Sequence, residues 1–446
     1  MSAPSLAEKP SLRRDRAAKT LIISICALVA VYLVQAFSPL RLNVDVIAYL
    51  AKGAAIAEGT SDPFAGWALP PGYPYLIALL DAMGLGSSAV FVVVNVLAMV
   101  AGLLGVYGLL RHDLELGKWS AQIVCAMVLL SFVMVRHATL PMPELMFFGL
   151  ATLTLWSLVQ GRRADGIMRL WSFGAAIILI AVSISMRIIG IALVPAFAMS
   201  LWLVYRETRS KTPGRRPRAR FLIGLAVAAI GLSAFAILLL RNSFYLEQLY
   251  HIYRDYGVID NLNYMMRVRL TEWGELMANV PESQLPIESY WPLRVIGLIA
   301  LALVARGLYV RRGRWSECEV FFLSYVAILL VYTGHASRYW LPVLPLIFGW
   351  WALSVEWLSG AKWARPVVAA YLFVYTMLGI AALSYTSWIT FSGPDFARRY
   401  GGGSYAHVYE AAFSDQPGAT ERLTKTIDEV ALGLLRRYEP RADSTR

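Results

Sequence analysis

The chain has 446 residues, of which 58% are hydrophobic and only 16% are charged. A soluble domain cannot carry that ratio without large exposed apolar patches, so the composition excludes an ordinary soluble protein. The formal net charge of +12 comes without any DNA- or RNA-binding motif, and the basic residues lie mainly in short segments between apolar runs. This distribution is typical of a membrane protein with positive cytoplasmic loops, so we predict membrane lipids as partners and no nucleic acid.

Apolar runs recur along most of the chain, and each is long enough to cross a hydrocarbon layer of ~30 Å. We therefore predict an all-α polytopic membrane protein with about 11 transmembrane helices. The predicted spans are 20–38, 88–110, 119–136, 143–160, 170–186, 188–205, 221–241, 294–310, 317–334, 339–357 and 366–389. No cleavage pattern follows the first run, which is therefore predicted to be an uncleaved span. Isolated cysteines within or at the start of spans predict no disulfide.

Lys and Arg residues predict the orientation of these spans. With the N-terminus in the cytoplasm, the inner segments hold 23 Lys and Arg residues, whereas the outer segments before residue 390 hold ten. Cytoplasmic loops carry the positive excess, so this orientation is favoured. The chain then divides into a basic cytoplasmic N-terminus (1–19), a transmembrane domain (20–389) with outer loops at 39–87 and 242–293, and an outer C-terminal tail (390–446).

The first outer loop contains the residue that we single out for chemistry, Asp45. It lies near the start of a predicted interfacial helix for which Asn43 is a suitable cap, and Tyr49 and Lys52 share its face at helical spacing. A carboxylate that is ionised but poorly solvated is a usable general base. The spacing alone leaves open the alternative that Asp45 merely caps the helix.

Five further ionisable residues lie in tight outer turns between spans: His137, Glu144, Arg187, His335 and Arg338. We expect them to converge with the first outer loop on one outer cavity. Arginine forks hold phosphate oxygens and offset the charge of a leaving phosphate, so the set suits transfer from an anionic lipid phosphate. For Arg187, a snorkelling role at the membrane interface is the alternative.

The second outer loop, 242–293, is rich in Tyr and Trp, which favour the headgroup level. It is predicted either as an interfacial belt or as a wall that contacts lipid or sugar, with part of it lying flat in the interface. The tail contains an amphipathic segment at 419–439, and Gly401–Gly403 predicts a hinge or a turn. We expect this tail to rest on the outer surface, because it is too short for a large core of its own.

The chain resembles the GT-C superfamily of polyprenyl-phosphate-sugar glycosyltransferases, in the branch of the bacterial protein O-mannosyltransferases and lipid A aminoarabinose transferases. The matching pieces, in order, are Asp45-Val46-Ile47-Ala48-Tyr49, Pro70-Pro71-Gly72-Tyr73-Pro74, Pro143-Glu144, Arg187-Ile188-Ile189-Gly190 and Arg338-Tyr339-Trp340-Leu341-Pro342. They cover about residues 20–350. Protein mannosyltransferases carry an Asp-Glu pair at the first piece, and this chain departs from them with Val46 after Asp45.

The resemblance implies a role for several residues. Asp45 corresponds to the catalytic acid of the family, and Arg187 and Arg338 correspond to residues that contact the carrier phosphate; we add His335 to that phosphate site. The predicted cavity or acceptor contacts are Tyr49, Lys52, Tyr73, His137 and Glu144. No acidic cluster with ligand spacing is present, so no metal site or cofactor is assigned, although one divalent metal ion bridging Asp45 to phosphate fits the chemistry.

The function that follows is transfer of a sugar, with inversion, from a polyprenyl-phosphate donor to a lipid, glycan or protein acceptor. The site is expected at the outer face of the bacterial cytoplasmic (inner) membrane. Two alternatives stay open: a lipid-linked oligosaccharide flippase or other transporter, and an enzyme of the O-antigen polymerase or ligase type. A transporter predicts internal repeats and mid-span charges, whereas a polymerase or ligase predicts Arg and His in one large late loop.

Overall fold

The computed structural model describes residues 9–67, 69–211, 219–241, 244–285, 290–332, 334–358, 360–413 and 426–439. Every regular element within these ranges is a helix, which confirms the predicted all-α fold. Parts of several predicted features lie outside the described residues, among them 1–8 of the basic N-terminus, 68 and 242–243 with 286–289 of the two outer loops, 333 of the span 317–334, and 414–425 with 440–446 of the tail.

Seven of the described helices are long and apolar enough to cross a membrane. They belong to α1 (Lys9–Val34), α4 (Ser88–His112), α7 (Glu144–Arg163), α8 (Gly166–Met186), α9 (Leu193–Lys211), α13 (Trp291–Val310) and α16 (Ala364–Thr390). The pair α5 (Lys118–Leu129) and α6 (Phe132–Ala138), bent by 53°, makes an eighth if it is counted as one span. The protein is therefore a multi-pass membrane protein.

The other three predicted spans are helical as well, in α10 (Ala219–Arg241), α14 (Glu317–Val331) and α15 (Leu344–Leu358). Helices α14 and α15 have only 15 residues each. At ~1.5 Å per residue, neither helix reaches across ~30 Å of hydrocarbon on its own. They are shorter than predicted because the chain between them leaves the helical path and forms the short helix η4 (Ser337–Trp340), which carries Arg338.

The outside of this bundle is apolar. Trp171 of α8, Leu298 of α13 and Phe373 of α16 are each more than half exposed. Large apolar side chains in such positions would be costly in water but are suited to lipid.

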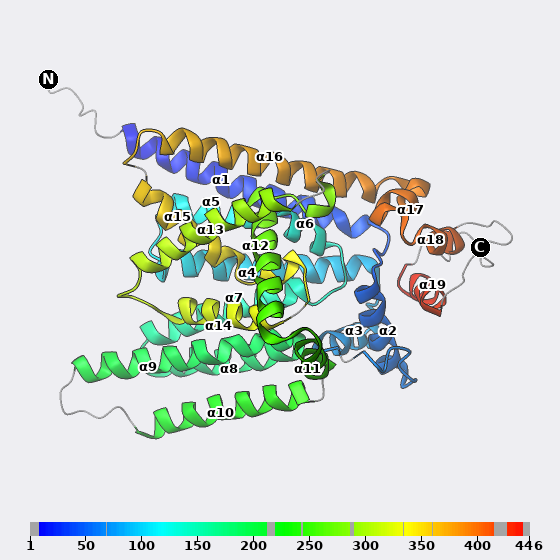
Figure 1. Cartoon of the computed structure of the whole chain (residues 1–446), viewed down its shortest axis with the longest axis horizontal. Coiled ribbons are helices and arrows are strands. Elements are labelled where there is room, and N and C mark those ends of the chain that lie inside the picture. The colour runs from blue at the N-terminus through cyan, green and yellow to red at the C-terminus, as the bar shows by residue number, and fades with distance from the viewer. Residues whose placement is uncertain are drawn as a thin grey trace.

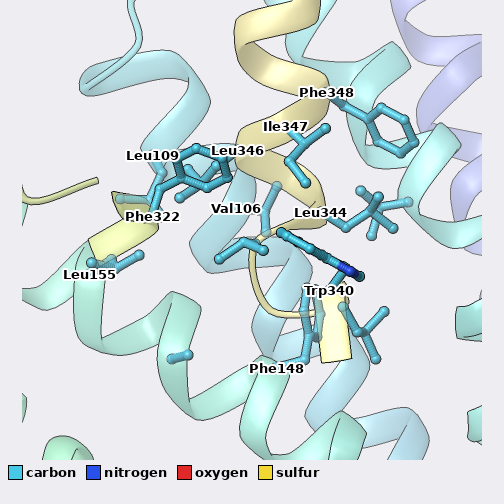
Figure 2. Packing of buried hydrophobic residues seen from close by; sticks show 14 of the residues in the cluster. Val106, Leu109, Phe148, Leu155, Phe322, Trp340, Leu344, Leu346, Ile347 and Phe348 are labelled. Atoms are coloured by element: carbon cyan, nitrogen blue, oxygen red, sulfur yellow. The ribbon is translucent and has the colours of Figure 1, made fainter. Parts of the chain in front are cut away.

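Trp340, the last residue of η4, lies in the main hydrophobic core of the bundle. Its side chain is almost wholly buried, and Figure 2 shows it among Val106 of α4, Phe148 of α7 and Leu344 of α15. Its indole Nε1 donates a hydrogen bond to Glu272 Oε2 at 2.7 Å. Because a buried tryptophan needs a partner for its single donor, this bond and the surrounding packing together hold η4 in place.

One end of the bundle, which we call the Asp45 end, is covered by helices that lie outside the spans (Figure 1). They are α2 (Val44–Glu58), α3 (Gly72–Ala82), α17 (Phe396–Arg399), α18 (Ala406–Phe413) and α19 (Thr426–Tyr438). The tail does more than rest on the surface, because it shares one hydrophobic cluster with α2 and α3. Gly401 and Gly402 have φ angles of 58° and 66°, which side chains rarely tolerate, so the predicted glycine turn is confirmed.

Within the described residues, the segment predicted as the second outer loop (242–293) is mostly helical. Helix α11 (Phe244–Tyr256) is followed by α12 (Val258–Ala278), which runs across the direction of the spans in Figure 1. Helix α12 is partly core, because Arg269, Glu272 and Trp273 are buried. The buried charges are tolerated because Arg269 Nη1 contacts Glu272 Oε2 at 2.7 Å.

The opposite end, which we call the Arg311 end, is tied together by a network of buried ion pairs. Arg311 contacts Asp113 at 3.4 Å and Glu319 at 2.5 Å, while Arg162 contacts Asp113 at 3.0 Å and Glu317 at 3.2 Å. All three carboxylates are buried. The network joins the ends of α4 and α7 to the turn between α13 and α14.

We predict that Arg311→Met destabilises the protein by about 3–5 kcal/mol, because Asp113 and Glu319 lose a buried counter-charge. The measurement is thermal or denaturant unfolding of the purified protein in detergent. The matched control is Arg314→Met, which removes the ion pair with Glu115 whose two side chains are 76% and 61% exposed. An exposed pair contributes under about 1 kcal/mol, so equal destabilisation by both variants would contradict the prediction.

Candidate active site

Helix α2 brings Asp45 to the site, and Asn43 begins that helix. The side-chain Oδ1 of Asn43 accepts a hydrogen bond from the backbone N–H of Val46 at 2.8 Å. This bond caps the helix in the ordinary way. Asp45, in the first turn, makes a different contact, because Arg338 Nη2 donates to its Oδ2 at 2.6 Å. The side chain that caps α2 is therefore that of Asn43 and not that of Asp45.

The ion pair of Asp45 is the first link of an alternating chain of four charges. The second arginine contact runs from Arg338 Nε to Glu144 Oε1 at 3.4 Å, and Arg187 Nη1 reaches the same Glu144 oxygen at 2.5 Å. We call this set, Asp45–Arg338–Glu144–Arg187, the charge chain. The charge chain is neutral overall, because its two carboxylates balance its two guanidiniums. The four residues lie up to 293 positions apart in sequence.

Three of the four charged residues, Glu144, Arg187 and Arg338, lie at points where the chain passes from one helix to the next. Glu144 is the first residue of α7, directly after Pro143, and Arg187 is the last residue before the short helix η2 (Ile188–Ala192). Arg338 belongs to η4, which is held by Trp340. Each charged residue thus lies where a helix starts or stops, so it reaches the site without lying in the middle of a span.

Tyr339 lies against both arginines. Its ring centroid is 5.1 Å from the Arg187 guanidinium carbon and 5.4 Å from that of Arg338. Its backbone oxygen accepts a hydrogen bond from the Tyr325 hydroxyl at 2.5 Å. Stacking on an aromatic face orients guanidinium planes, so Tyr339 helps to aim the two forks.

Electrostatics favour a firmly charged Arg338. Burial by itself lowers the pKa of this guanidinium, but Glu144, Tyr339 and Asp45 more than offset that effect and raise the pKa above its usual value. Oε2 of Glu144 and Nε of Arg338 are buried and make no hydrogen bond within the described part of the chain. Buried polar atoms without partners are uncommon, so the charge chain has capacity left for a ligand.

A mostly apolar cavity of about 410 Å³ lies on the Arg187 side of the charge chain. It is lined by Arg187 and Tyr339 together with aliphatic residues such as Ile188, Ile328 and Leu329. A cavity of this size, with few polar groups at fixed places, is typical of a site for an apolar ligand that has a charged end.

A second cavity, of about 510 Å³, lies on the other side of Arg338 and is polar. Its polar lining comes mainly from α12, the short helix η3 (Glu282–Gln284), the start of α13, and η4 with the segment before it. These residues are Tyr264, Thr271, Glu272, Glu275, Glu282, Ser283, Tyr290, Arg294, His335, Ser337 and Arg338, with Asn43, Arg136 and His137 from elsewhere. Burial raises the pKa of the Glu275 carboxyl, which accepts hydrogen bonds from the hydroxyl of Ser337 and the backbone of Glu282. Mixed acids, bases and hydroxyls of this kind suit a ligand with many hydroxyl groups.

The remaining predicted residues are distributed around these cavities. Tyr49 lines the apolar cavity, whereas His137 and His335 line the polar one. His335 therefore lies in the polar cavity with Arg338, whereas Arg187 lines the apolar cavity. Tyr73 is buried edge-on against Tyr49, with ring centroids 5.6 Å apart, and supports the site from behind.

Lys52 forms an ion pair with Asp62 at 3.6 Å within the segment 39–87 and lines neither cavity. Seven residues after Asp45, it lies on the same face of α2 but two helical turns, or about 10 Å, farther along the axis. Its contact with the acceptor stays a prediction.

Several site residues were not singled out from the sequence. Arg136, Tyr264 and Arg294 line the polar cavity, and Tyr339 joins the two arginines. Tyr339 lies inside the matching Arg-Tyr-Trp-Leu-Pro piece, so that motif could have pointed to it. No signal of comparable strength marks Arg294, because α12 and α13 reach the site only through tertiary packing.

Within the described residues, no group of three His, Cys, Asp or Glu side chains is arranged to hold a metal ion. Asp45 and Glu144 are the carboxylates of the charge chain, and each already faces an arginine. A divalent ion bridging Asp45 to a phosphate stays a prediction.

No family model matches the chain, and no curated protein matches it in sequence. Among solved structures, it is similar to ArnT from Cupriavidus metallidurans bound to undecaprenyl phosphate, at 14% identity and a TM-score of 0.47, over 96% of this chain and 77% of that one. It is also similar to the archaeal oligosaccharyltransferase AglB from Archaeoglobus fulgidus in complex with an inhibitory peptide and a dolichol-phosphate. There the identity is 13% and the TM-score 0.45, over 92% of this chain and 59% of that one. The chemistry of this chain therefore has to rest on its own site residues.

We predict that Glu144→Gln destabilises the protein by about 3 kcal/mol, because two neighbouring guanidiniums lose their shared buried counter-charge. Inorganic phosphate should raise the unfolding temperature of this variant more than that of the wild type, since an added anion replaces the lost charge. The matched control is Glu319→Gln at the Arg311 end, where the Arg311 side chain is only 8% exposed. Equal rescue of both variants by phosphate would contradict an anion site at the charge chain.

Proposed function

We propose that the protein is a glycosyltransferase that moves a sugar from a polyprenyl-phosphate donor to a hydroxyl group of a lipid, glycan or protein acceptor. The observation that carries this proposal is the charge chain and its position between an apolar and a polar cavity. The resemblance of its motifs to those of GT-C glycosyltransferases supports the same function. Each part of the site has a matching part of the reaction.

The donor would use the apolar side. An isoprenoid chain needs an apolar surface, and its phosphate needs fixed positive charge at one end of that surface. Arg187 lines the apolar cavity. Arg338 lies next to Arg187, because both arginines contact the same oxygen of Glu144. Two guanidinium forks hold phosphate oxygens more specifically than ammonium groups do.

Asp45 would act as the general base. The acceptor oxygen forms a bond to the anomeric carbon while the bond between that carbon and the phosphate oxygen breaks. The electron pair leaves with the polyprenyl phosphate, whose charge the two arginines offset, and the hydroxyl proton passes to Asp45. Attack from the side opposite the phosphate inverts the configuration at the anomeric carbon.

The ion pair of Asp45 is compatible with this role. The Asp45 side chain is 36% exposed and uses Oδ2 to contact Arg338. A bound donor phosphate competes for the same guanidinium, and this competition loosens the hold of Arg338 on the carboxylate. Donor binding would therefore prepare Asp45 to accept a proton.

The polar cavity would receive the sugar and the acceptor hydroxyl. We further propose that it opens at the outer face of a bacterial cytoplasmic membrane, with the N-terminus in the cytoplasm. The predicted inner segments hold 23 Lys and Arg residues and the outer segments before residue 390 hold ten, which supports that orientation. The flippase alternative is less well supported, because the charged side chains of the described spans lie near helix ends rather than along a path through the bundle.

The proposal is tested with purified protein in proteoliposomes and a panel of radiolabelled polyprenyl-phosphate hexoses and pentoses. We expect the wild type to transfer the label and release polyprenyl phosphate from one donor. Asp45→Asn should reduce transfer at least about 100-fold while donor binding persists, since a general base contributes about 10²–10⁴-fold. Full activity of the variant would remove Asp45 as base, and labelled donor that crosses the bilayer unchanged would favour the flippase.

Arg187→Ala and Arg338→Ala should each weaken donor binding about tenfold or more, because a hydrogen bond to a charged group contributes about 1.5–3 kcal/mol. Arg338→Lys should restore only part of the affinity, since an ammonium group keeps the charge without the fork. Binding is measured by titration with a fluorescent polyprenyl phosphate. Arg399→Ala, which removes a tail pair with Asp395, is the control. Unchanged affinity in both site variants would exclude a phosphate site at the charge chain.

A further inference from the structure

The segment that leads into α2 is held by the C-terminal tail. The Tyr409 hydroxyl donates a hydrogen bond to the backbone oxygen of Leu40 at 2.7 Å and accepts one from the backbone N–H of Leu42 at 3.0 Å. The Tyr400 hydroxyl donates to the oxygen of Leu42 at 2.9 Å, and Glu439 Oε2 accepts from the N–H of Leu40 at 3.1 Å. Three tail side chains thus satisfy all four backbone polar groups of Leu40 and Leu42.

This arrangement is unusual for a loop, because buried backbone groups are normally satisfied by regular secondary structure. Leu40 and Leu42 are each only 2% exposed, so water cannot replace the three tail side chains. Loss of one such bond leaves a buried group unpaired, which is costlier than the bond itself is favourable. The path of this segment therefore depends on the tail.

The residue between the two leucines is anchored to the bundle instead. Arg41 is 4% exposed and donates to the hydroxyl of Ser38, the hydroxyl of Thr390 and the backbone oxygen of Thr386, each at 3.0 Å. Its guanidinium also lies 5.7 Å from the ring centroid of Tyr400. The segment is thus fixed between the end of α16 and the tail, three residues before Asp45.

The tail also holds the far side of the same unit. Arg437 of α19 forms ion pairs with Asp81 of α3, at 3.0 Å, and with Glu58 of α2. The Tyr438 hydroxyl donates to Asp81 Oδ2 at 2.8 Å. These contacts dock α19 on α2 and α3 without touching Leu40 or Leu42, so they separate general docking from control of the segment before Asp45.

We propose that Tyr400, Tyr409 and Glu439 are positioning residues that set the place of Asp45 for the transfer reaction. The inference rests on the proposed function of Asp45 as general base. In the described part of the tail, the three side chains bond to the backbone of Leu40 and Leu42, before α2, and not to the guanidinium of Arg338, so we expect them to act on turnover and to leave donor affinity unchanged. A small misplacement of a reacting group is enough to lower turnover strongly.

The experiment uses the full-length protein in detergent or proteoliposomes, with Tyr409→Phe as the test and Tyr438→Phe as the matched control. Each variant removes one tail hydroxyl, but only the first removes bonds to Leu40 and Leu42. Hydrogen–deuterium exchange of the peptide covering residues 38–46 reports the segment directly. Turnover with the active donor from the panel and the affinity for polyprenyl phosphate are measured in parallel.

We expect Tyr409→Phe to speed exchange in residues 38–46 and to lower turnover at least about tenfold, with donor affinity unchanged within about twofold. Tyr438→Phe should leave both exchange in this peptide and turnover near wild type. Glu439→Ala should behave like Tyr409→Phe, whereas Glu439→Gln, which keeps an acceptor for the Leu40 N–H, should recover most of the turnover.

Two results would overturn the positioning role: unchanged exchange in Tyr409→Phe, or an equal loss of turnover in Tyr409→Phe and Tyr438→Phe. A loss of donor affinity that parallels the loss of turnover would also overturn it, because the tail would then act on the whole site. Failure of the proposed function is distinguishable from these, since it appears as a wild-type protein that transfers no sugar from any donor.

Discussion

The carboxylate of Glu144 is the constraint on which the site depends. Two guanidiniums cannot lie side by side at the end of an apolar bundle without a shared counter-charge, because their repulsion is poorly screened there. Glu144 supplies that charge and so brings together the start of α7, the end of α8 and the short helix η4. Asp45 then extends the alternation outward from the bundle. An anion that enters the site therefore meets two fixed arginines and not an empty apolar surface.

The surrounding structure turns this arrangement into a site with two sides. The apolar cavity takes its lining largely from η2 and α14, whereas the polar cavity takes its lining largely from α12, η3, the start of α13 and η4. Trp340 and Glu272 hold η4 from the core, and the tail holds the entry to α2. Arg338 and Asp45 are thus positioned by two independent supports that meet at their ion pair. Such separate supports suit a reaction in which donor and acceptor approach from different sides.

Much of the fold could be predicted because the hydrocarbon core of a membrane imposes long apolar runs. Most of the expected spans correspond to long apolar helices. The exceptions have a physical cause: η4 interrupts the apolar stretch that contains α14 and α15, and α12 is a partly buried helix because Arg269 and Glu272 neutralise each other. The site residues at helix ends, Glu144, Arg187 and Arg338, could be selected because a charge at membrane depth is costly. Arg294 and Tyr264 could not, since their place in the polar cavity depends on how α12 crosses the bundle.

By itself, the sequence determined that the chain crosses a membrane many times and that most of its charged residues lie outside the apolar runs or near their ends, because apolar length and the cost of buried charge act locally along the chain. It also singled out Asp45, but left it either a helix cap or a reactive carboxylate. Only the tertiary structure assigned the cap to Asn43 and placed Asp45 against Arg338, 293 positions away, and the reactive role of Asp45 is our proposal. The dependence of Leu40 and Leu42 on Tyr400, Tyr409 and Glu439 could not be predicted either, because hydrogen bonds between a side chain and the backbone of a distant segment leave no local pattern in the sequence.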